Sequence, residues 1–203
     1  MIRLTIGLCT LIVLSGCKSS ECPTCAAARL TNKWCDRCAV GYVAGAPIKS
    51  KLLYEALDAH GHDLNIPQIA CQTCQAAVPV DGYCEKCRVG WVRRQAYFSR
   101  LTYHLAKGQP CDPKTIACPD CRKNSERYGW CDKCSVGMVG NVAIRSRADF
   151  DGARRGYDLM AAAIEASKRC DMCGIACLTD NTCFVCKIPY KDGKALPRVA
   201  SKS

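Results

Sequence analysis

The chain has 203 residues, a formal net charge of +11 and twenty cysteines, so about one residue in ten is cysteine. Only 14 residues are Phe, Trp or Tyr, which is too few to fill one large core and argues against a large single-core enzyme. The regular spacing of the cysteines also argues against a low-complexity disordered chain. The composition therefore predicts a fold held together by metal ions or by disulfides.

The N-terminus has the order of features found in a secretory signal. Arg3 supplies a positive charge, and the apolar run that follows is too short to cross a bilayer as a permanent helix. The run ends in Leu-Ser-Gly-Cys at 14–17, which resembles a bacterial lipobox. The resemblance implies a signal peptide over 1–16, a cysteine, Cys17, modified by acyl chains such as palmitate, and a tether over 17–21. An ordinary signal peptide cut nearby is the alternative.

A lipid anchor of this kind implies a place in the cell envelope. Lys18, not Asp, follows the lipidated cysteine, which resembles the pattern of lipoproteins on the periplasmic side of the outer membrane if the host is Gram-negative. The membrane is the partner expected through Cys17, since affinity grows with each buried methylene of the acyl chains. A protein or an anionic envelope component is the further partner that we expect. An exported protein meets little nucleic acid, so no nucleic-acid partner is expected.

Sixteen of the remaining cysteines form four copies of one pattern, C-x2-C-x9-C-x2-C. The copies start 49, 47 and 52 residues apart, whereas the inner spacing never varies. The constant spacing predicts that the four sulfurs of each copy converge on one centre. Four thiolates in a tetrahedron suit Zn²⁺. The predicted ligands of four zinc ions are Cys22, Cys25, Cys35, Cys38; Cys71, Cys74, Cys84, Cys87; Cys118, Cys121, Cys131, Cys134; and Cys170, Cys173, Cys183, Cys186.

This spacing is similar to that of double zinc-ribbon modules, which implies a β-hairpin that brings the two cysteine pairs of a copy face to face. Nine residues are enough for a short hairpin, and in three copies turn-forming residues precede an aromatic residue before the second pair (Trp34, Tyr83 and Trp130). The same three copies continue as Val-Gly-x-Val after the last cysteine. We interpret these aromatic and valine side chains as packing over each cluster.

Apolar periodicity predicts helices over 50–60, 95–107 and 148–169, although Gly152 and Gly156 weaken the last. The fold class expected is therefore a set of small metal-stapled α+β repeats, four zinc-ribbon-like hairpin units joined by short amphipathic helices. The expected divisions are four-cysteine units with their helices over 22–70, 71–117 and 118–169, a fourth unit over 170–190 and a basic disordered tail over 191–203.

The sixteen thiols allow other interpretations. Disulfides are the second, because export leads to an oxidising compartment, and iron is the third. A c-type haem is excluded, because no Cys-x-x-Cys pair is followed by His. Thiol–disulfide exchange is the leading enzymatic alternative. We expect no enzyme, since four protein ligands leave a zinc ion no open position. The function expected is structural zinc binding in a scaffold or interaction protein, with metal storage or redox chemistry as alternatives.

Two cysteines and two histidines outside the repeats are further candidate metal ligands. Cys111 and Cys177 have no place in the pattern; they form a pair with each other, or Cys177 lies beside the fourth site. His60 and His62 flank Gly61 at the end of a predicted helix and would add a metal ligand, although histidines in such positions are usually solvated or capping.

Overall fold

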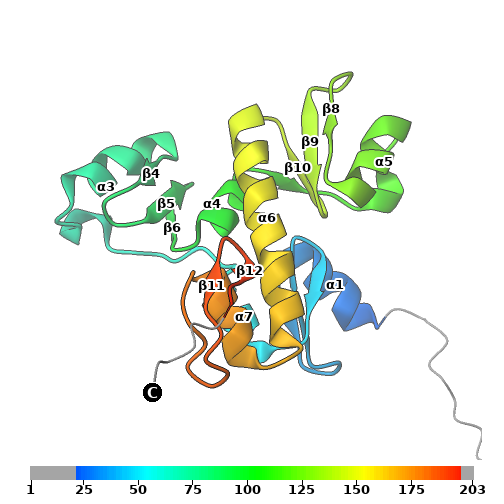
Figure 1. Ribbon diagram of the computed structural model, residues 1–203. Helices are drawn as coiled ribbons and strands as arrows, with labels where there is room; N and C mark the ends of the chain where they lie inside the picture. The colour runs from blue at the N-terminus through cyan, green and yellow to red at the C-terminus, as the bar shows by residue number, and fades with distance from the viewer. Residues whose placement is uncertain (1–21, 198–203) are drawn as a thin grey trace, which may run out of the picture.

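The computed structural model describes residues 22–197 (Figure 1). The predicted signal peptide, Cys17 and the tether lie outside the described residues. Within the described part of the chain, no helix is both long enough and apolar enough to cross a membrane.

The first three units share one order of elements, a helix, a short strand, two longer strands and a second helix. Unit 1 has α1 (Pro23–Thr31), β1 (Trp34–Cys35), β2 (Val40–Val43), β3 (Ala46–Ile48) and α2 (Lys51–Leu57). Unit 2 has α3 (Gln72–Ala77), η2 (Val78–Val80), β4 (Tyr83–Cys84), β5 (Val89–Val92), β6 (Gln95–Tyr97) and α4 (Arg100–Ala106). Unit 3 has α5 (Pro119–Arg127), β8 (Trp130–Cys131), β9 (Val136–Val139), β10 (Val142–Ile144) and α6 (Arg147–Ser167).

The fourth unit lacks the second helix. It has α7 (Asp171–Leu178), β11 (Tyr190–Lys191) and β12 (Lys194–Ala195). The connections between units hold η1 (Ile66–Gln68), β7 (Gln109–Pro110) and η3 (Pro113–Thr115). The β11–β12 hairpin corrects the expected division at the C-terminus, because ordered structure continues through 191–195, where a disordered tail was expected. Its backbone pairing explains the difference, since Leu196 N–H also donates to Pro189 O at 2.8 Å.

The strands of each of the first three units form an antiparallel sheet in the same register. The sheet orders are β1-β2-β3, β4-β5-β6 and, with one added strand, β7-β10-β9-β8. The aromatic residue before the third cysteine always pairs with the glycine of Val-Gly-x-Val: Trp34 with Gly41, Tyr83 with Gly90 and Trp130 with Gly137. The repeated sequence is therefore a repeated structure.

The segment between the two cysteine pairs is helical, which corrects the expected hairpin. In each unit the first pair lies at the start of a helix. In units 1 to 3 the third cysteine ends a short strand, and the fourth lies in the turn that follows it. Two of these helices begin with Pro23 and Pro119 in the first turn, a position where proline already has the φ of a helix and loses no hydrogen bond. Ala26, Ala27 and Ala28 then favour the helix in unit 1. The units are small α+β repeats, but the local order is helix and then hairpin.

The predicted connecting helices are found in modified form. The helix expected over 50–60 is α2, which ends at Leu57 with Asp58 in the left-handed region at φ 47°. The first residues of the segment 95–107 form β6 instead, because they pair with β5, and α4 begins only at Arg100. The helix expected over 148–169 is α6, with 21 residues.

The glycines of α6 lie where α4 crosses it. A Cβ atom at Gly152 would lie 2.4 Å from Nε2 of His104, and one at Gly156 would lie 2.8 Å from Cβ of Leu101. Glycine costs helix stability, but here it allows two helices to approach closely. The residues that weakened the helix prediction are thus the residues on which the packing of unit 2 against unit 3 depends.

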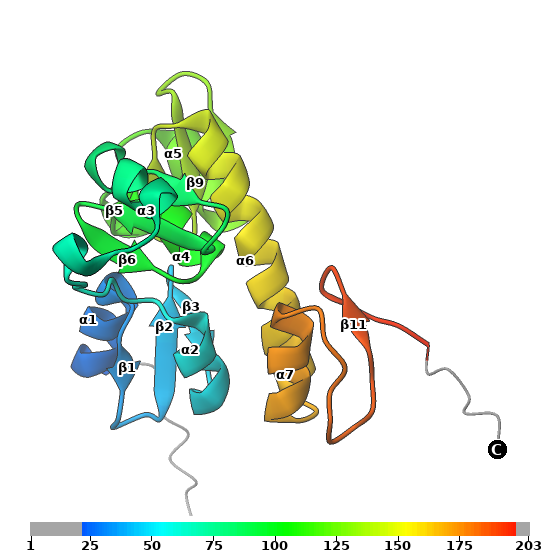
Figure 2. The ribbon, with the colours of Figure 1, turned by 90° about the vertical axis from the view of Figure 1, so that its left-hand side faces the viewer.

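The largest core joins units 1, 3 and 4 around α6, which runs the length of the molecule (Figures 1 and 2). Leu53 of unit 1, Phe150 of unit 3 and Cys173 of unit 4 are all buried in it. Unit 2 projects to one side in Figure 1 and has its own smaller apolar clusters, one around Trp91 and one around Tyr103. The four units are therefore unequal in the apolar core available to them.

Candidate metal centres

The structure brings the predicted cysteines together in four groups. Within each group the four Sγ atoms all lie within 4.8 Å of one another, and the groups are the four quartets expected from the spacing. This confirms that the sulfurs of each copy converge on one centre.

The first two cysteines of each quartet lie at a helix N-terminus. Cys22 is the N-cap residue of α1, and Cys25 is its third helical residue; Cys71, Cys118 and Cys170 are the N-cap residues of α3, α5 and α7. Residues three apart lie on one face of a helix, and the unpaired N–H groups of the first turn favour negative charge. The two residues between the cysteines thus place both sulfurs beside the first turn of a helix.

The last two cysteines lie at a tight turn, which joins two strands in units 1 to 3 and follows the isolated bridge between Thr182 and Pro189 in unit 4. The backbone N–H of Cys87 donates to Sγ of Cys84 at 3.4 Å, and that of Cys186 donates to Sγ of Cys183 at 3.3 Å. The residue that follows the turn has a left-handed backbone in all four units, with φ between 48° and 57°; these residues are Ala39, Arg88, Ser135 and Lys187. A non-glycine residue in this region costs about 1 kcal/mol or more. The turn is therefore held in place by interactions beyond its own backbone.

The spacing of the sulfurs fits one metal ion per quartet. Sγ of Cys71 lies 3.9 Å from Sγ of Cys84, and Sγ of Cys170 lies 3.9 Å from Sγ of Cys183. A tetrahedron with Zn–S bonds of about 2.3 Å has sulfur–sulfur edges of about 3.8 Å. Four thiolates are a ligand set for Zn²⁺ or for a single iron ion. A bound ion of this kind would hold the start of the helix and the turn of the hairpin together.

The pKa values of the thiols differ within a quartet. In units 1 to 3 the N-cap cysteine has a lowered pKa, about 6 for Cys22 and Cys71 and about 7 for Cys118. The main cause is a hydrogen bond from the backbone N–H of the second cysteine of the same pair, which is Cys25, Cys74 or Cys121. In the fourth unit, burial raises the pKa of Cys183, but N–H groups and neighbouring thiols outweigh it and the pKa is about 7.

Each quartet also contains thiols that are harder to ionise. Hydrogen bonding to Cys25 and Cys22 raises the pKa of Cys38 to about 12, and burial raises the pKa of Cys173 to about 12. Burial likewise raises the pKa of Cys74 and Cys121. A bound cation would favour the thiolate form of these sulfurs, because metal ligands must be deprotonated.

Two tyrosines contact cysteines of the quartets. Burial and a hydrogen bond to Cys25 raise the pKa of Tyr42, and burial and a hydrogen bond to Cys173 raise the pKa of Tyr190 to about 12. Both tyrosines occupy the same place in their units, four residues after the last cysteine of the quartet. Their hydroxyl groups are suited to donating to a metal-bound thiolate.

A second repeated arrangement, which the sequence analysis missed, joins each hairpin to the helix that follows it. A Cβ atom at Gly41 would lie 2.3 Å from the ring of Tyr54; at Gly90 it would lie 2.2 Å from the ring of Tyr103, and at Gly137 it would lie 2.1 Å from the ring of Phe150. Each ring also lies against the aromatic residue before the third cysteine, with centroids 5.3–5.5 Å apart. The glycine is therefore the only residue that leaves room for the second ring.

The same three helices carry a cation over the first ring. Lys51, Arg100 and Arg147 lie 4.4–5.9 Å from the ring centroids of Trp34, Tyr83 and Trp130, respectively. The signal was present in the sequence: the second aromatic residue always follows the glycine by 13 positions, and the cation always precedes that aromatic residue by three. The repeated unit thus extends well beyond the cysteines, and only the fourth unit lacks this part.

The quartets differ in their exposure to solvent. In units 1 to 3 two cysteines are buried, and the last one, Cys38, Cys87 or Cys134, is exposed. In unit 4 two cysteines are buried and none is exposed. The fourth centre is therefore the most enclosed, in keeping with its place in the largest core.

The candidate ligands outside the repeats lie outside the quartets. Cys111 and Cys177 are both free, and Cys177 is fully buried in the core next to Tyr190 of the fourth unit. His60 Nε2 lies 3.1 Å from the hydroxyl oxygen of Tyr54, and His62 Nε2 lies 2.7 Å from Oδ1 of Asp58. The structure thus places the two histidines in local hydrogen bonds.

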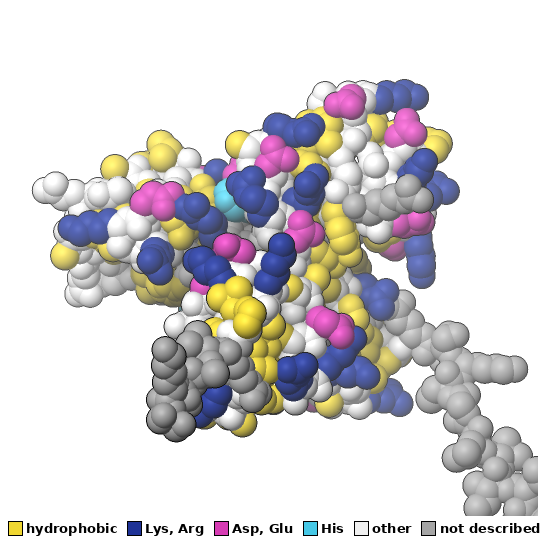
Figure 3. Space-filling view, viewed as in Figure 1, with side chains coloured by type: hydrophobic (Ala, Val, Ile, Leu, Met, Phe, Trp, Pro, Cys, Tyr) yellow, Lys and Arg dark blue, Asp and Glu magenta, His cyan; other side chains and the backbone are white. Residues whose placement is uncertain are grey.

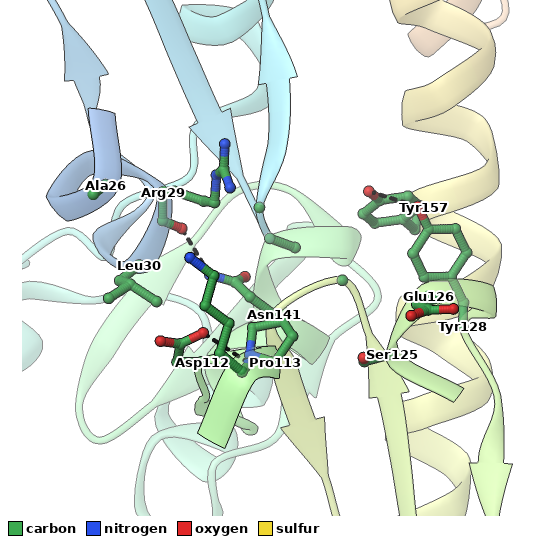
Figure 4. Close-up of a pocket in the computed structure, with 14 residues that line it drawn as sticks. Ala26, Arg29, Leu30, Asp112, Pro113, Ser125, Glu126, Tyr128, Asn141 and Tyr157 are labelled. Carbon is green, nitrogen blue, oxygen red and sulfur yellow. Dashed lines mark hydrogen bonds between the residues drawn. The ribbon is translucent and has the colours of Figure 1, made fainter. Parts of the chain in front are cut away.

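A cavity of about 460 Å³ lies between unit 1 and unit 3 (Figure 4). Asn141 crosses it: its Nδ2 donates to Arg29 O at 2.7 Å, and its backbone N–H donates to Ala44 O at 3.2 Å. On the opposite wall the hydroxyl of Tyr128 donates to that of Tyr157 at 3.1 Å. Oδ1 of Asn141 has no partner among the described residues and is itself enclosed, so a molecule in the cavity would not reach it. We interpret the polar groups here as joining the two units.

The cysteine quartets therefore form the site with the clearest chemistry in the described chain. Comparison of the chain with protein-family models, with curated proteins and with solved structures found no match.

Proposed function

We propose that this protein is a lipid-anchored cell-envelope scaffold in which four structural zinc ions, one per cysteine quartet, hold together four small units that present surfaces to a partner. The observation that carries this proposal is the convergence of sixteen cysteines into four groups whose sulfurs lie within 4.8 Å of one another. Each group joins a helix to a hairpin, so a bound ion would act on the fold of its own unit.

The ligand count supports a structural role for the metal. Four protein thiolates complete a tetrahedron, whereas a catalytic zinc ion keeps a position for water or substrate. The small size of the units supports the same role. The larger apolar cluster of unit 2 has only seven buried residues, two of them cysteines of its own quartet. A core of this size gives marginal stability on its own, and small domains commonly gain the rest from metal.

The charge of the chain supports zinc thiolates over neutral thiols. Residues 18–203 carry 28 Lys and Arg against 18 Asp and Glu, a net charge of +10. Each quartet with one Zn²⁺ contributes −2, which leaves a metal-loaded chain near +2. Basic residues also follow or lie within the cysteine turns, among them Arg37, Lys86, Arg88, Lys133 and Lys187. Such cations offset the charge of metal-bound thiolates.

We expect four zinc ions per chain in protein purified from the cell envelope without added metal. Elemental analysis of the purified protein measures this directly, and a thiol count after denaturation without reductant separates the alternatives. Zinc sites leave sixteen reactive thiols in the quartets, whereas disulfides leave none there. Colour with a visible absorption band would assign iron. Fewer than one zinc per chain would overturn the zinc proposal.

The lipid anchor rests on the N-terminal motif, and it has a separate test. Mass spectrometry of protein from the membrane fraction should show an N-terminal peptide that begins at Cys17 and carries acyl chains. A Cys17→Ala variant should keep residues 1–16, because the cysteine is the modified residue that processing requires. A wild-type chain that is cut elsewhere and carries no acyl group would contradict the anchor and leave the metal proposal intact.

Metal storage is a second candidate, and one observation favours it. The last cysteine of quartets 1 to 3 is exposed, which gives a competing ligand access to the ion. Storage sites should exchange radioactive or isotopically labelled zinc within minutes while the helices persist. Structural sites should exchange slowly and lose structure when the ion is removed.

A further inference from the structure

The turn between the last two cysteines of unit 4 differs from its three counterparts. In units 1 to 3 this turn carries one acidic and one basic residue, all of them exposed; these pairs are Asp36-Arg37, Glu85-Lys86 and Asp132-Lys133. In unit 4 it carries Phe184 and Val185, whose side chains are 63% and 58% exposed. The residue after the turn has the same left-handed backbone in all four units, so the clearest difference lies in the side chains that the turn exposes.

This apolar pair is held in a rigid position. The N–H of Lys187 donates to Cys183 O at 2.7 Å, and the N–H of Cys186 donates to Sγ of Cys183 at 3.3 Å. The two side chains between these cysteines therefore cannot fold back into the core, where their burial would be favourable. Leu196, which is 45% exposed, lies on the adjoining hairpin. Unit 4 thus exposes apolar side chains to water at a turn where the other three units expose charged ones.

Exposed basic residues also stand on both sides of the fourth quartet. Arg169 directly precedes its first cysteine, and Lys187 directly follows its last, and both side chains are exposed. Basic residues are spread among acidic ones over the whole face in Figure 3, but only in unit 4 do they lie beside an apolar turn. Apolar side chains flanked by cations are typical of a segment that enters an anionic lipid surface.

Unit 4 lies at the end of the molecule that the proposed anchor would bring to the membrane. Units 1 and 4 occupy the same lower end in Figures 1 and 2, where α2 packs against α7. A Cβ atom at Gly174 of α7 would lie 3.4 Å from Cδ2 of Leu53 in α2. Only residues 18–21 separate Cys17 from the first quartet. An acylated Cys17 would therefore hold this end within reach of the headgroups.

We propose that the Phe184–Val185 turn of unit 4 docks into an anionic membrane surface, as a second contact beside the lipid anchor. This inference rests on the proposed envelope location. The two contacts together would fix the orientation of the scaffold on the bilayer, with units 2 and 3 held away from it. The occupant is a lipid surface rather than a protein, because the exposed apolar tips lie beside basic side chains at the end of the molecule nearest the proposed anchor.

The test uses the zinc-loaded chain 18–203, which contains every described residue and lacks the acyl anchor. The chain is mixed with vesicles of about one-third phosphatidylglycerol in phosphatidylethanolamine, and the bound fraction is measured by sedimentation. The key variant is F184D/V185K, because it copies the acid–base pattern of the other turns and leaves the net charge unchanged. The matched control is L64S/V80S, which removes two exposed apolar side chains, 40% and 71% exposed, from unit 2 and the segment that leads into it.

We expect the wild type and the L64S/V80S control to bind anionic vesicles alike, and the F184D/V185K variant to bind about tenfold or more weakly. Vesicles of phosphatidylcholine should bind the wild type weakly. Equal binding by the wild type and F184D/V185K would overturn the proposal, as would no binding to anionic vesicles. A wild type that dimerises without lipid, with a monomeric F184D/V185K variant, would assign the turn to a second copy instead. Zinc content measured on the same samples shows whether a failure concerns the docking turn or the metal centres.

Discussion

Removal of the metal should unfold the protein, and unit 2 should unfold first. A structural zinc ion contributes about 10–16 kcal/mol of apparent binding free energy in small zinc-binding peptides, whereas a whole domain is stable by only about 5–15 kcal/mol. Unit 2 has the smallest share of the apolar core, since the cluster around α6 contains only Leu101 and Leu105 from it, both on α4. Its helix α3 and its hairpin are therefore the elements that depend most on Cys71, Cys74, Cys84 and Cys87.

The measurement is circular dichroism and hydrogen exchange of the reduced protein during titration with a strong zinc chelator. Exchange should rise first in 71–97, while α6 keeps its protection until the centres of units 1, 3 and 4 lose their ions. Re-addition of zinc should restore both signals. Helices that persist after complete loss of zinc and with all thiols reduced would show that the metal is not structural, and metal storage would then be the better interpretation.

A Gly90→Ala substitution should lower the stability of unit 2 by about 3 kcal/mol, at the upper end of what overpacking costs in protein cores. The added Cβ would lie 2.2 Å from Cδ2 of Tyr103 and 2.6 Å from its Cβ. The ring has no free space to move into, because it also lies against Tyr83, with centroids 5.3 Å apart. The strand or the helix must therefore shift. This prediction does not depend on which metal is bound.

Gly82→Ala provides the control within the same unit. The nearest atoms to its added Cβ lie at 3.3 Å, and the backbone needs no glycine-specific φ, so we expect a change below about 1 kcal/mol. Hydrogen exchange of the unit 2 amides in the zinc-loaded protein measures both variants. A Tyr103→Leu substitution should recover part of the loss in the Gly90→Ala background, because it replaces the ring that the methyl group meets. Equal stability of the two glycine variants would contradict the packing that we describe.

The members of each cysteine quartet could be predicted from the sequence, because they lie close together in the chain. The four cysteines of a quartet span only 17 residues, and a two-residue spacing has few ways to place two sulfurs on one centre. The conformation between the pairs did not follow, because a nine-residue segment is long enough for either a hairpin or a helix. Pro23 and Pro119 favour the helix, whereas the turn-forming residues before the second cysteine pair favour a hairpin.

The boundaries of the connecting helices depended on strand pairing. Tyr97 fits an apolar helix face by its spacing, yet it pairs with Gly90 in the sheet of unit 2. A strand and a helical turn would both satisfy the backbone hydrogen bonds of this segment, so local propensity could not decide between strand and helix. The aromatic rings over the glycines were open to prediction, since they follow the glycines by a constant 13 residues.

The sequence by itself determined the number of candidate metal centres, the members of each and the order of the units along the chain. Only the tertiary structure decided that units 1, 3 and 4 share one core while unit 2 stands apart, and that unit 4 places an apolar turn at the end of the molecule near unit 1. The physical reason is how far apart in the chain the contacting residues lie. Sulfurs that bind one ion are set by spacing within a unit, whereas the contact of His104 with Gly152 joins residues far apart in the chain, and no short-range pattern specifies it.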